Sequence, residues 1–95
     1  MHSLSLTSRV KVTPEQVSSE LGQEVVILHV KNGVYYGLDE VGVVIWKALQ
    51  QGCQVAEIIA RVMGEFDVDQ AKCEQDVLRI LGELVDAQLV SVEAA

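Results

Sequence analysis

Residues 32–46, NGVYYGLDEVGVVIW, contain a turn, a short aromatic strand and the start of a helix in one continuous stretch. Asn32 and Gly33 tolerate a positive φ angle, which predicts a two-residue type I′ turn and a tight hairpin. The strand before this turn is EVVILHV, residues 24–30, and its β-branched apolar side chains favour a central strand covered on much of both faces. The return strand is VYYGL, residues 34–38.

A two-residue turn places Val30 opposite Tyr35 and His29 opposite Tyr36 in the predicted hairpin. Side chains alternate along a strand, so one face carries Val34, Tyr36 and Leu38 and the other carries Tyr35 and Gly37. Alternation alone leaves open which tyrosine belongs to the core and which to a binding surface.

Three helices are predicted after the hairpin. Asp39 is a suitable N-cap for a helix that Gly52 ends, and a second helix covers about residues 55–66. Asp69 caps a third helix over about residues 70–87, and a short strand follows at residues 89–92. Before the hairpin, residues 8–14 alternate as an edge strand does, and SSELGQE, residues 18–24, indicates a polar connection.

This order predicts an α+β fold of winged helix-turn-helix type, with a small antiparallel three-stranded sheet packed on three helices. Residues 1–95 are expected to form a single domain, because a second core would have too little chain. No apolar run is long enough to cross a membrane, and residues 1–12 lack the pattern of a signal peptide. A cytoplasmic location is therefore expected.

The net charge of −7 is concentrated in the helical part of the chain. Residues 1–38 sum to zero, whereas residues 39–95 carry four basic and eleven acidic side chains, which gives −7. Nucleic-acid binding usually needs a basic face, so this distribution argues against DNA and RNA as partners.

The predicted third helix has a wider apolar face than one buried contact requires. A core stripe of Ala71, Val77, Leu78, Leu81 and Val85 is widened by Cys73, Ile80 and Leu84. The helix is either packed between a sheet and another helix, or one flank lines an open groove. If residues 34–38 form a sheet edge beside that flank, the edge can accept one more strand.

Residues that carry catalysis or bind metals are sparse. The sequence contains no phosphate-binding glycine loop, no HExxH and no CxxC pair, and His2 and His29 are its only histidines. Cys53 and Cys73 lie in helical-looking sequence, so two buried thiols are expected rather than a disulfide. These features predict a protein that is not an enzyme, with no catalytic residue, no metal site and no cofactor.

From Gly33 onward the sequence resembles the PqqD-type recognition domain, the RiPP recognition element that binds leaders of ribosomally made, modified peptides. The resemblance rests on GVYYGLDEVGVVIWKALQQG, residues 33–52, and on VAEIIARVMGEFDVDQAKCEQDVLRILGELVDAQLV, residues 55–90. It is greatest towards the stand-alone leader-binding proteins of lasso-peptide clusters. Two departures are Gln88, where many relatives have glycine, and the loosely matching residues 1–24. Gln88 predicts a less sharply capped end of the third helix.

The resemblance implies that a leader peptide adds as a strand beside the hairpin's second strand and packs against the third helix. The implied leader-binding residues are Val34, Tyr35, Tyr36, Gly37, Cys73, Asp76, Val77, Ile80 and Leu84. It further implies a bacterial cytoplasmic adaptor that delivers the precursor peptide to a leader protease and other maturation enzymes, such as a macrocyclase. An open sheet edge also permits a homodimer or a domain swap.

Three alternatives stay open. The domain could be a PqqD-type peptide chaperone for a radical SAM or other modifying enzyme, or a small subunit bound constitutively to a partner protein. It could also be a winged-helix DNA-binding protein, but that function predicts a basic third helix. Residues 67–88 instead hold Lys72 and Arg79 against six acidic side chains.

Overall fold

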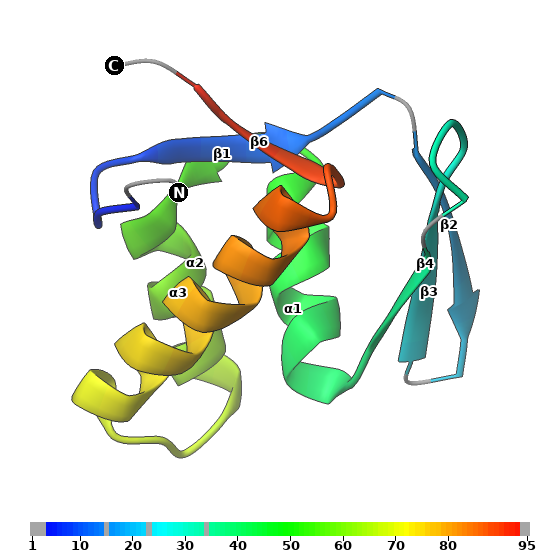
Figure 1. Ribbon diagram of the computed structural model, residues 1–95. Helices are drawn as coiled ribbons and strands as arrows, with labels where there is room; N and C mark the ends of the chain where they lie inside the picture. Colours follow the sequence, from blue (N-terminus) through cyan, green and yellow to red (C-terminus); the bar gives the residue numbers. More distant parts are fainter. Residues whose placement is uncertain (1–3, 15, 23, 34, 94–95) are drawn as a thin grey trace.

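The computed structural model describes residues 4–14, 16–22, 24–33 and 35–93, and its helices and strands are shown in Figure 1. In chain order they are β1 (Arg9–Val12), β2 (Gln16–Leu21), β3 (Glu24–His29), β4 (Tyr35–Leu38), α1 (Glu40–Leu49), β5 (Cys53–Gln54), α2 (Val55–Glu65), α3 (Gln70–Asp86) and β6 (Val90–Glu93). The predicted helices and the final strand are confirmed to within one or two residues at most of their ends.

The strands form two antiparallel three-stranded sheets, with the orders β5-β1-β6 and β2-β3-β4. The α+β class with three helices is therefore confirmed, but there are two sheets where the sequence predicts one. The prediction of β1 as an edge strand was wrong, because β1 lies between β5 and β6. Its partners come from distant parts of the chain, and local alternation carries no information about them. In Figure 1 this sheet crosses one end of the helices, while β2-β3-β4 stands beside α1.

A polar connection over residues 18–24 was also a wrong prediction, because β2 pairs with β3 from Gln16 opposite His29 to Leu21 opposite Glu24. Most of β2 is exposed on both faces. An outer strand with so little buried surface needs no apolar alternation, so its sequence resembles a loop. Gly22, with φ of +67°, begins the turn into β3.

The β3–β4 hairpin differs in register from the prediction by two residues. Tyr35 pairs with Leu28 rather than with Val30. The turn is longer than two residues: the Gly33 N–H donates to the His29 carbonyl at 2.9 Å, and Gly33, unlike Asn32, has a positive φ. Because the shift is even, the side chains of Tyr35–Leu38 keep their predicted faces.

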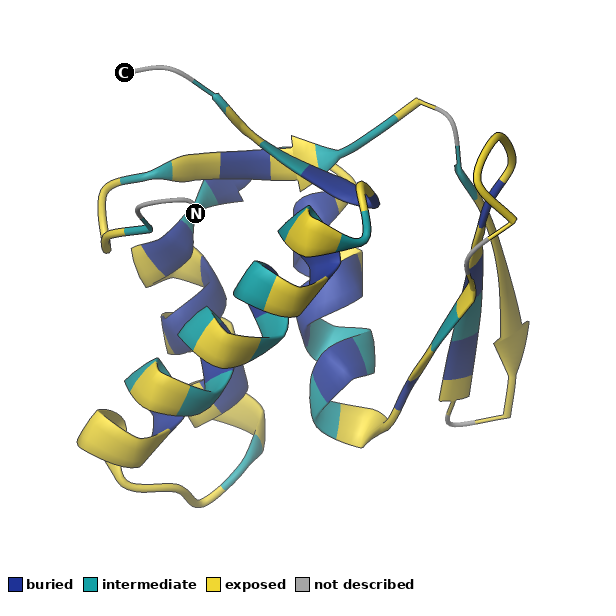
Figure 2. Ribbon diagram, viewed as in Figure 1, coloured by how far each residue is buried: buried dark blue, intermediate teal, exposed yellow. Residues whose placement is uncertain are grey.

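The inner face of the β2-β3-β4 sheet packs on the helices, and its outer face is open. Val25 and Ile27 of β3 are buried, whereas Leu28 between them and the turn is exposed. The expectation that β3 is covered on much of both faces was therefore wrong, because no helix of the described residues lies over the outer face (Figure 2). Leu38, at the end of β4, is buried and joins this sheet to the core.

The two ends of α1 are fixed by residues that the sequence indicates. The Asp39 Oδ1 atom accepts a hydrogen bond from the Gly42 N–H at 3.1 Å, which confirms the N-cap of α1. Gly52, with φ of +70°, follows α1. The core between the helices contains Ile45, Leu49, Ile58, Val77 and Leu81, together with Trp46.

The C-terminal end of α3 is fully capped although Gln88 replaces glycine. Gln88 has φ of +63°, its N–H donates to the Val85 carbonyl at 3.0 Å, and the Leu89 N–H donates to the Leu84 carbonyl at 2.9 Å. These two bonds make a Schellman motif, and the side chains of Leu84 and Leu89 are both buried. The prediction of a less sharply capped end was therefore wrong.

Candidate functional site

β4 is an outer strand of the β2-β3-β4 sheet. Among the residues that the structure describes, it pairs with β3 on one side and with no strand on the other. In an antiparallel pair, every second residue directs its N–H and C=O groups away from its partner. The free side of β4 therefore offers backbone groups to one more strand. Val34, the first residue of the predicted edge, lies outside the described residues.

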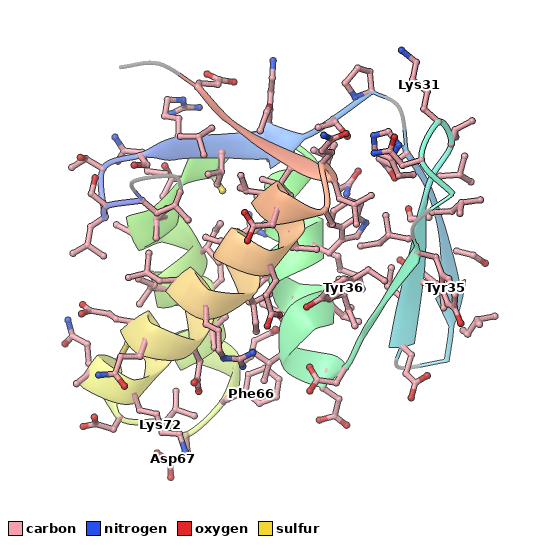
Figure 3. All side chains as sticks on the ribbon, viewed as in Figure 1. Lys31, Tyr35, Tyr36, Phe66, Asp67 and Lys72 are labelled. Carbon is pink, nitrogen blue, oxygen red and sulfur yellow. The ribbon has the colours of Figure 1, made fainter. Side chains whose placement is uncertain are left out.

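The two tyrosines of β4 point to opposite faces of the sheet, as Figure 3 shows. Tyr35 is 70% exposed on the outer face, whereas Tyr36 is half-buried and points towards the helices. The open choice between core and surface is thus resolved by the fold: only Tyr36 packs against the core. Gly37 follows, and an added Cβ there would meet no atom within 4 Å, so the space beside it is open.

Tyr36 connects the edge strand to α3. Its hydroxyl donates a hydrogen bond to the Glu83 carboxylate. Burial, together with this hydrogen bond and the negative charge of Glu83, raises the pKa of Tyr36 from 10.0 to about 12. The phenol therefore remains a neutral donor at physiological pH. Arg79 lies within 3.5 Å of the same carboxylate, so one glutamate joins a tyrosine and an arginine.

The α3 residues predicted to bind the leader divide into two layers. Cys73, Val77 and Leu84 are at most 2% exposed and lie in the core, whereas Asp76 and Ile80 are half-buried. The wide apolar face of α3 is thus explained mainly by core packing. Cys73 and Leu84, predicted to widen the core stripe, are buried in the core, whereas Ala71, predicted to lie in the stripe, is exposed. Apolar spacing predicts that a helix has a buried stripe, but the rotation of that stripe is fixed by packing, which for α3 is mainly against α2 and β6.

A pocket of about 190 Å³ lies between β4, the start of α1 and α3. Its lining residues are Tyr36, Gly37, Leu38, Asp39, Gly42, Arg79, Ile80 and Glu83. The sequence predicted Tyr36, Gly37 and Ile80 as site residues but missed Arg79 and Glu83. Their four-residue spacing beside Ile80 was the available signal, because it places both on the side of the helix next to that residue.

Larger hollows of about 390 Å³ and 460 Å³ lie on the other side of α1, and both include Val43, Lys47 and Glu65. Neither adjoins the free side of β4. The smaller pocket is therefore the better candidate site, because it alone among these hollows joins an open strand edge to a helix wall.

The described residues give little support for chemical catalysis. No group of three or more histidine, cysteine or acidic side chains among them could hold a metal ion. Burial raises the pKa of the Cys53 and Cys73 thiols, which disfavours the reactive thiolate. His29 is buried in β3, where its Nδ1 atom accepts a hydrogen bond from the Asn32 N–H at 3.2 Å. No helix within the described ranges is long and apolar enough to cross a membrane.

Comparisons with known proteins agree with this geometry. The family model for coenzyme PQQ synthesis protein D (PqqD) matches residues 24–90. A sequence comparison with curated proteins gave no match. The solved structure of TbiB1 in complex with the TbiA(beta) leader peptide is 35% identical, with a TM-score of 0.81 over 90% of this chain and 99% of that chain. A lasso peptide synthetase B1 complexed with the leader peptide is 20% identical and has the same fold, with a TM-score of 0.76 over 86% and 96% of the two chains.

Proposed function

Because this chain belongs to the PqqD family, we propose that it is a non-catalytic adaptor for a ribosomally synthesised precursor peptide. It binds the leader region of that peptide as an added strand on β4. The open edge of β4 beside the α3 pocket carries this proposal. The leader-bound state of the two similar structures supports the same function, and their description as lasso-peptide proteins favours lasso-peptide biosynthesis.

Strand addition explains how one small site could both hold and select a peptide. Backbone hydrogen bonds from β4 would supply affinity that depends little on sequence, and side-chain pockets would supply selectivity. A leader strand beside β4 alternates its side chains between the two faces of the sheet. Those on the inner face meet the pocket with Ile80, Arg79 and Glu83, while those on the outer face lie beside Tyr35.

The proposed leader-binding residues act at different depths. Tyr35, Tyr36 and Gly37 form the edge, and Asp76 and Ile80 form the accessible wall. Val34 stays in the proposed set as the residue that precedes this edge in the sequence. Cys73, Val77 and Leu84 are buried beneath that wall and shape it without a free surface of their own. Arg79 and Glu83 join the proposed set because they line the pocket.

Capture of the leader would serve enzymes that act on the rest of the precursor. Tethering raises the local concentration of a substrate without any new contact at the enzyme's own site. The proposed partners are a leader protease and the other maturation enzymes of the pathway, in the bacterial cytoplasm. A chaperone for a radical SAM or other modifying enzyme would use the same leader site. A second copy paired on β4 would compete with the leader for the edge.

DNA binding has little support from the third helix. Arg79 lies beside Glu83, and the acidic side chains of residues 67–88 outnumber the basic ones by six to two. Such a surface repels the phosphate backbone.

The test is an amide NMR titration of the protein with the synthetic leader of the precursor peptide encoded beside it. Saturable shifts at Tyr35–Gly37 and along Asp76–Glu83 are expected, and random duplex DNA should cause none. The absence of shifts with this leader would refute the adaptor function and favour a constitutive subunit. Shifts caused by DNA alone would favour the nucleic-acid alternative.

Leaders methylated on the backbone nitrogen test strand addition itself while the protein stays unaltered. Only alternate amides of an added strand face β4. Methylation of one alternate set should abolish binding, and methylation of the other set should leave binding nearly unchanged. Equal loss with both sets would contradict an added strand.

A further inference from the structure

Gln88 holds a backbone conformation that glycine adopts more easily. Among the described residues it is the only non-glycine residue with a positive φ, at +63°. The Schellman bonds at the end of α3 use only backbone atoms, so a glycine at this position would make them without the steric cost of a Cβ. The side chain of Gln88 is therefore not needed for the cap.

The side chain of Gln88 instead connects α3 to the β3–β4 loop. Its Oε1 atom accepts a hydrogen bond from the Asn32 Nδ2 atom at 2.7 Å, across 56 residues of sequence. Its backbone carbonyl accepts a second bond from the Thr13 Oγ1 atom at 3.1 Å. One residue thus joins the end of α3, the tip of the hairpin and the segment after β1.

Asn32 is well placed to transmit this connection to β4. Its N–H donates to His29, and the next residue, Gly33, donates to the His29 carbonyl, so the loop is fixed on β3. β4 follows the loop directly and continues through Asp39 into α1. Side-chain hydrogen bonds between described residues therefore link the hairpin to α3 and its end, from Tyr36 to Glu83 near the pocket and from Asn32 to Gln88 at the loop.

We propose that Gln88 is a positioning residue for the peptide cleft: its side chain fixes the hairpin loop against α3 and so sets the separation of β4 from the helix wall. This inference rests on the proposed function, because the cleft concerned is the leader site. The strained backbone at residue 88 is retained for the reach of the glutamine side chain.

The first test compares stability with peptide affinity in the variant Gln88→Gly. Relief of the left-handed strain should raise the thermal midpoint, while loss of one interelement hydrogen bond should weaken binding of the synthetic leader about three- to tenfold. If Gln88 had a purely structural role, the more stable Gln88→Gly variant would bind the leader at least as tightly as the wild type. Binding by Gln88→Gly as tight as by the wild type would overturn the proposal.

Two further variants show whether the Asn32–Gln88 bond is responsible. Gln88→Glu keeps an acceptor for Asn32, and its affinity should stay within about twofold of the wild type. Asn32→Ala should match the affinity of Gln88→Gly, and the double variant should be no weaker than either single one. Additive losses in the double variant would contradict the bond. As a control, Asn32→Ala and the double variant Asn32→Ala/Gln88→Glu should bind the leader with equal affinity. This result would exclude a direct effect of the charge that Gln88→Glu adds.

Amide hydrogen exchange of the free protein keeps this proposal separate from the leader function. Gln88→Gly should speed exchange in Tyr35–Leu38 and leave the buried turns of α3 protected. Unchanged exchange in β4 would refute the positioning role even if no leader binds. Faster exchange in β4 with no binding by the wild type would instead refute the leader function alone.

Discussion

The two small sheets of this protein have the same number of strands and opposite relations to the core. The β5-β1-β6 sheet places Val10, Cys53 and Val90 in the interior and covers one end of the helices. The β2-β3-β4 sheet buries one face only, and its outer face exposes Val17, Leu28 and Tyr35, which lie side by side across the three strands. The first sheet completes the core, whereas the second displays an edge and a face.

This contrast separates what stabilises the domain from what can bind. A surface intended for a partner must leave apolar groups and backbone donors in contact with water until the partner arrives. Such groups add little to the stability of the free protein. The two sheets should therefore respond differently to the same kind of mutation.

The largest expected difference comes from truncating one valine in each sheet. Val10→Ala removes methyl groups from a fully buried site and should lower the free energy of unfolding by about 2–3 kcal/mol. Val17→Ala, at a side chain that is 58% exposed, should change it by less than about 0.5 kcal/mol. Denaturant unfolding of both variants measures the difference. Equal losses would mean that the outer face of the hairpin sheet is also part of the stable core.

A matched pair of glycines tests how the hairpin sheet is joined to the helices. A Cβ at Gly42 of α1 would lie 2.9 Å from the Cβ and Cδ2 atoms of Leu38, the buried end of β4. Gly42→Ala should therefore lower the free energy of unfolding by about 1–3 kcal/mol, and it should weaken leader binding by displacing β4. Gly64 of α2 has open space around it, so Gly64→Ala should stabilise by up to about 1 kcal/mol.

Thermal unfolding and leader titration of these two variants provide the measurement. If Gly42→Ala were as stable as the wild type, Leu38 would not fix the hairpin against α1. The Gly64→Ala variant is the control, because it makes the same chemical change within a helix far from β4 in sequence.

A smaller and pH-dependent effect is expected for Tyr36→Phe, which removes the bond between β4 and Glu83. The substitution should lower the free energy of unfolding by about 0.5–1.5 kcal/mol at neutral pH. Because folding raises the pKa of Tyr36 from 10.0 to about 12, its contribution is fully present below pH 10 and is lost as the pH rises through 12. The stability difference between wild type and Tyr36→Phe should shrink over this range. A constant difference would show that the phenol proton is not involved.

The smallest effect is expected from thiol-alkylating reagents on Cys53 of β5 and Cys73 of α3. Cys53 and Cys73 are buried, and burial raises the pKa of both. Alkylation of the native protein at neutral pH should be negligible and should become complete after unfolding. Rapid native labelling of Cys73 alone would mean that the α3 wall opens, which would bring this residue to the cleft surface.

Sequence reasoning was most accurate where the structure is determined by neighbours along the chain. The cap at Asp39, the end of α1 at Gly52 and the start of α3 at Asp69 all depend on residues within a few positions. The face assignment of Tyr35 and Tyr36 was also correct. It depends on the twofold repeat of a strand, which an even error in register does not change.

Predictions were wrong where a partner distant in the sequence decides the outcome. β2 carries polar residues because it is an exposed edge, and only its pairing with β3 makes it a strand. The buried stripe of α3 contains Cys73, Val77, Leu81 and Leu84, because α3 packs mainly against α2 and β6. Arg79 and Glu83 reach the pocket only because β4 brings Tyr36 beside them.

The sequence by itself determined the α+β class, the N-caps of α1 and α3, the alternation of the hairpin and the acidic character of the helical part, since each depends on local spacing or composition. Only the tertiary structure decided that there are two sheets, which side of α3 is buried, and which residues meet at the free edge of β4. Those features depend on the packing of segments that are far apart in the chain, and local spacing does not encode the rotation or the partner of an element.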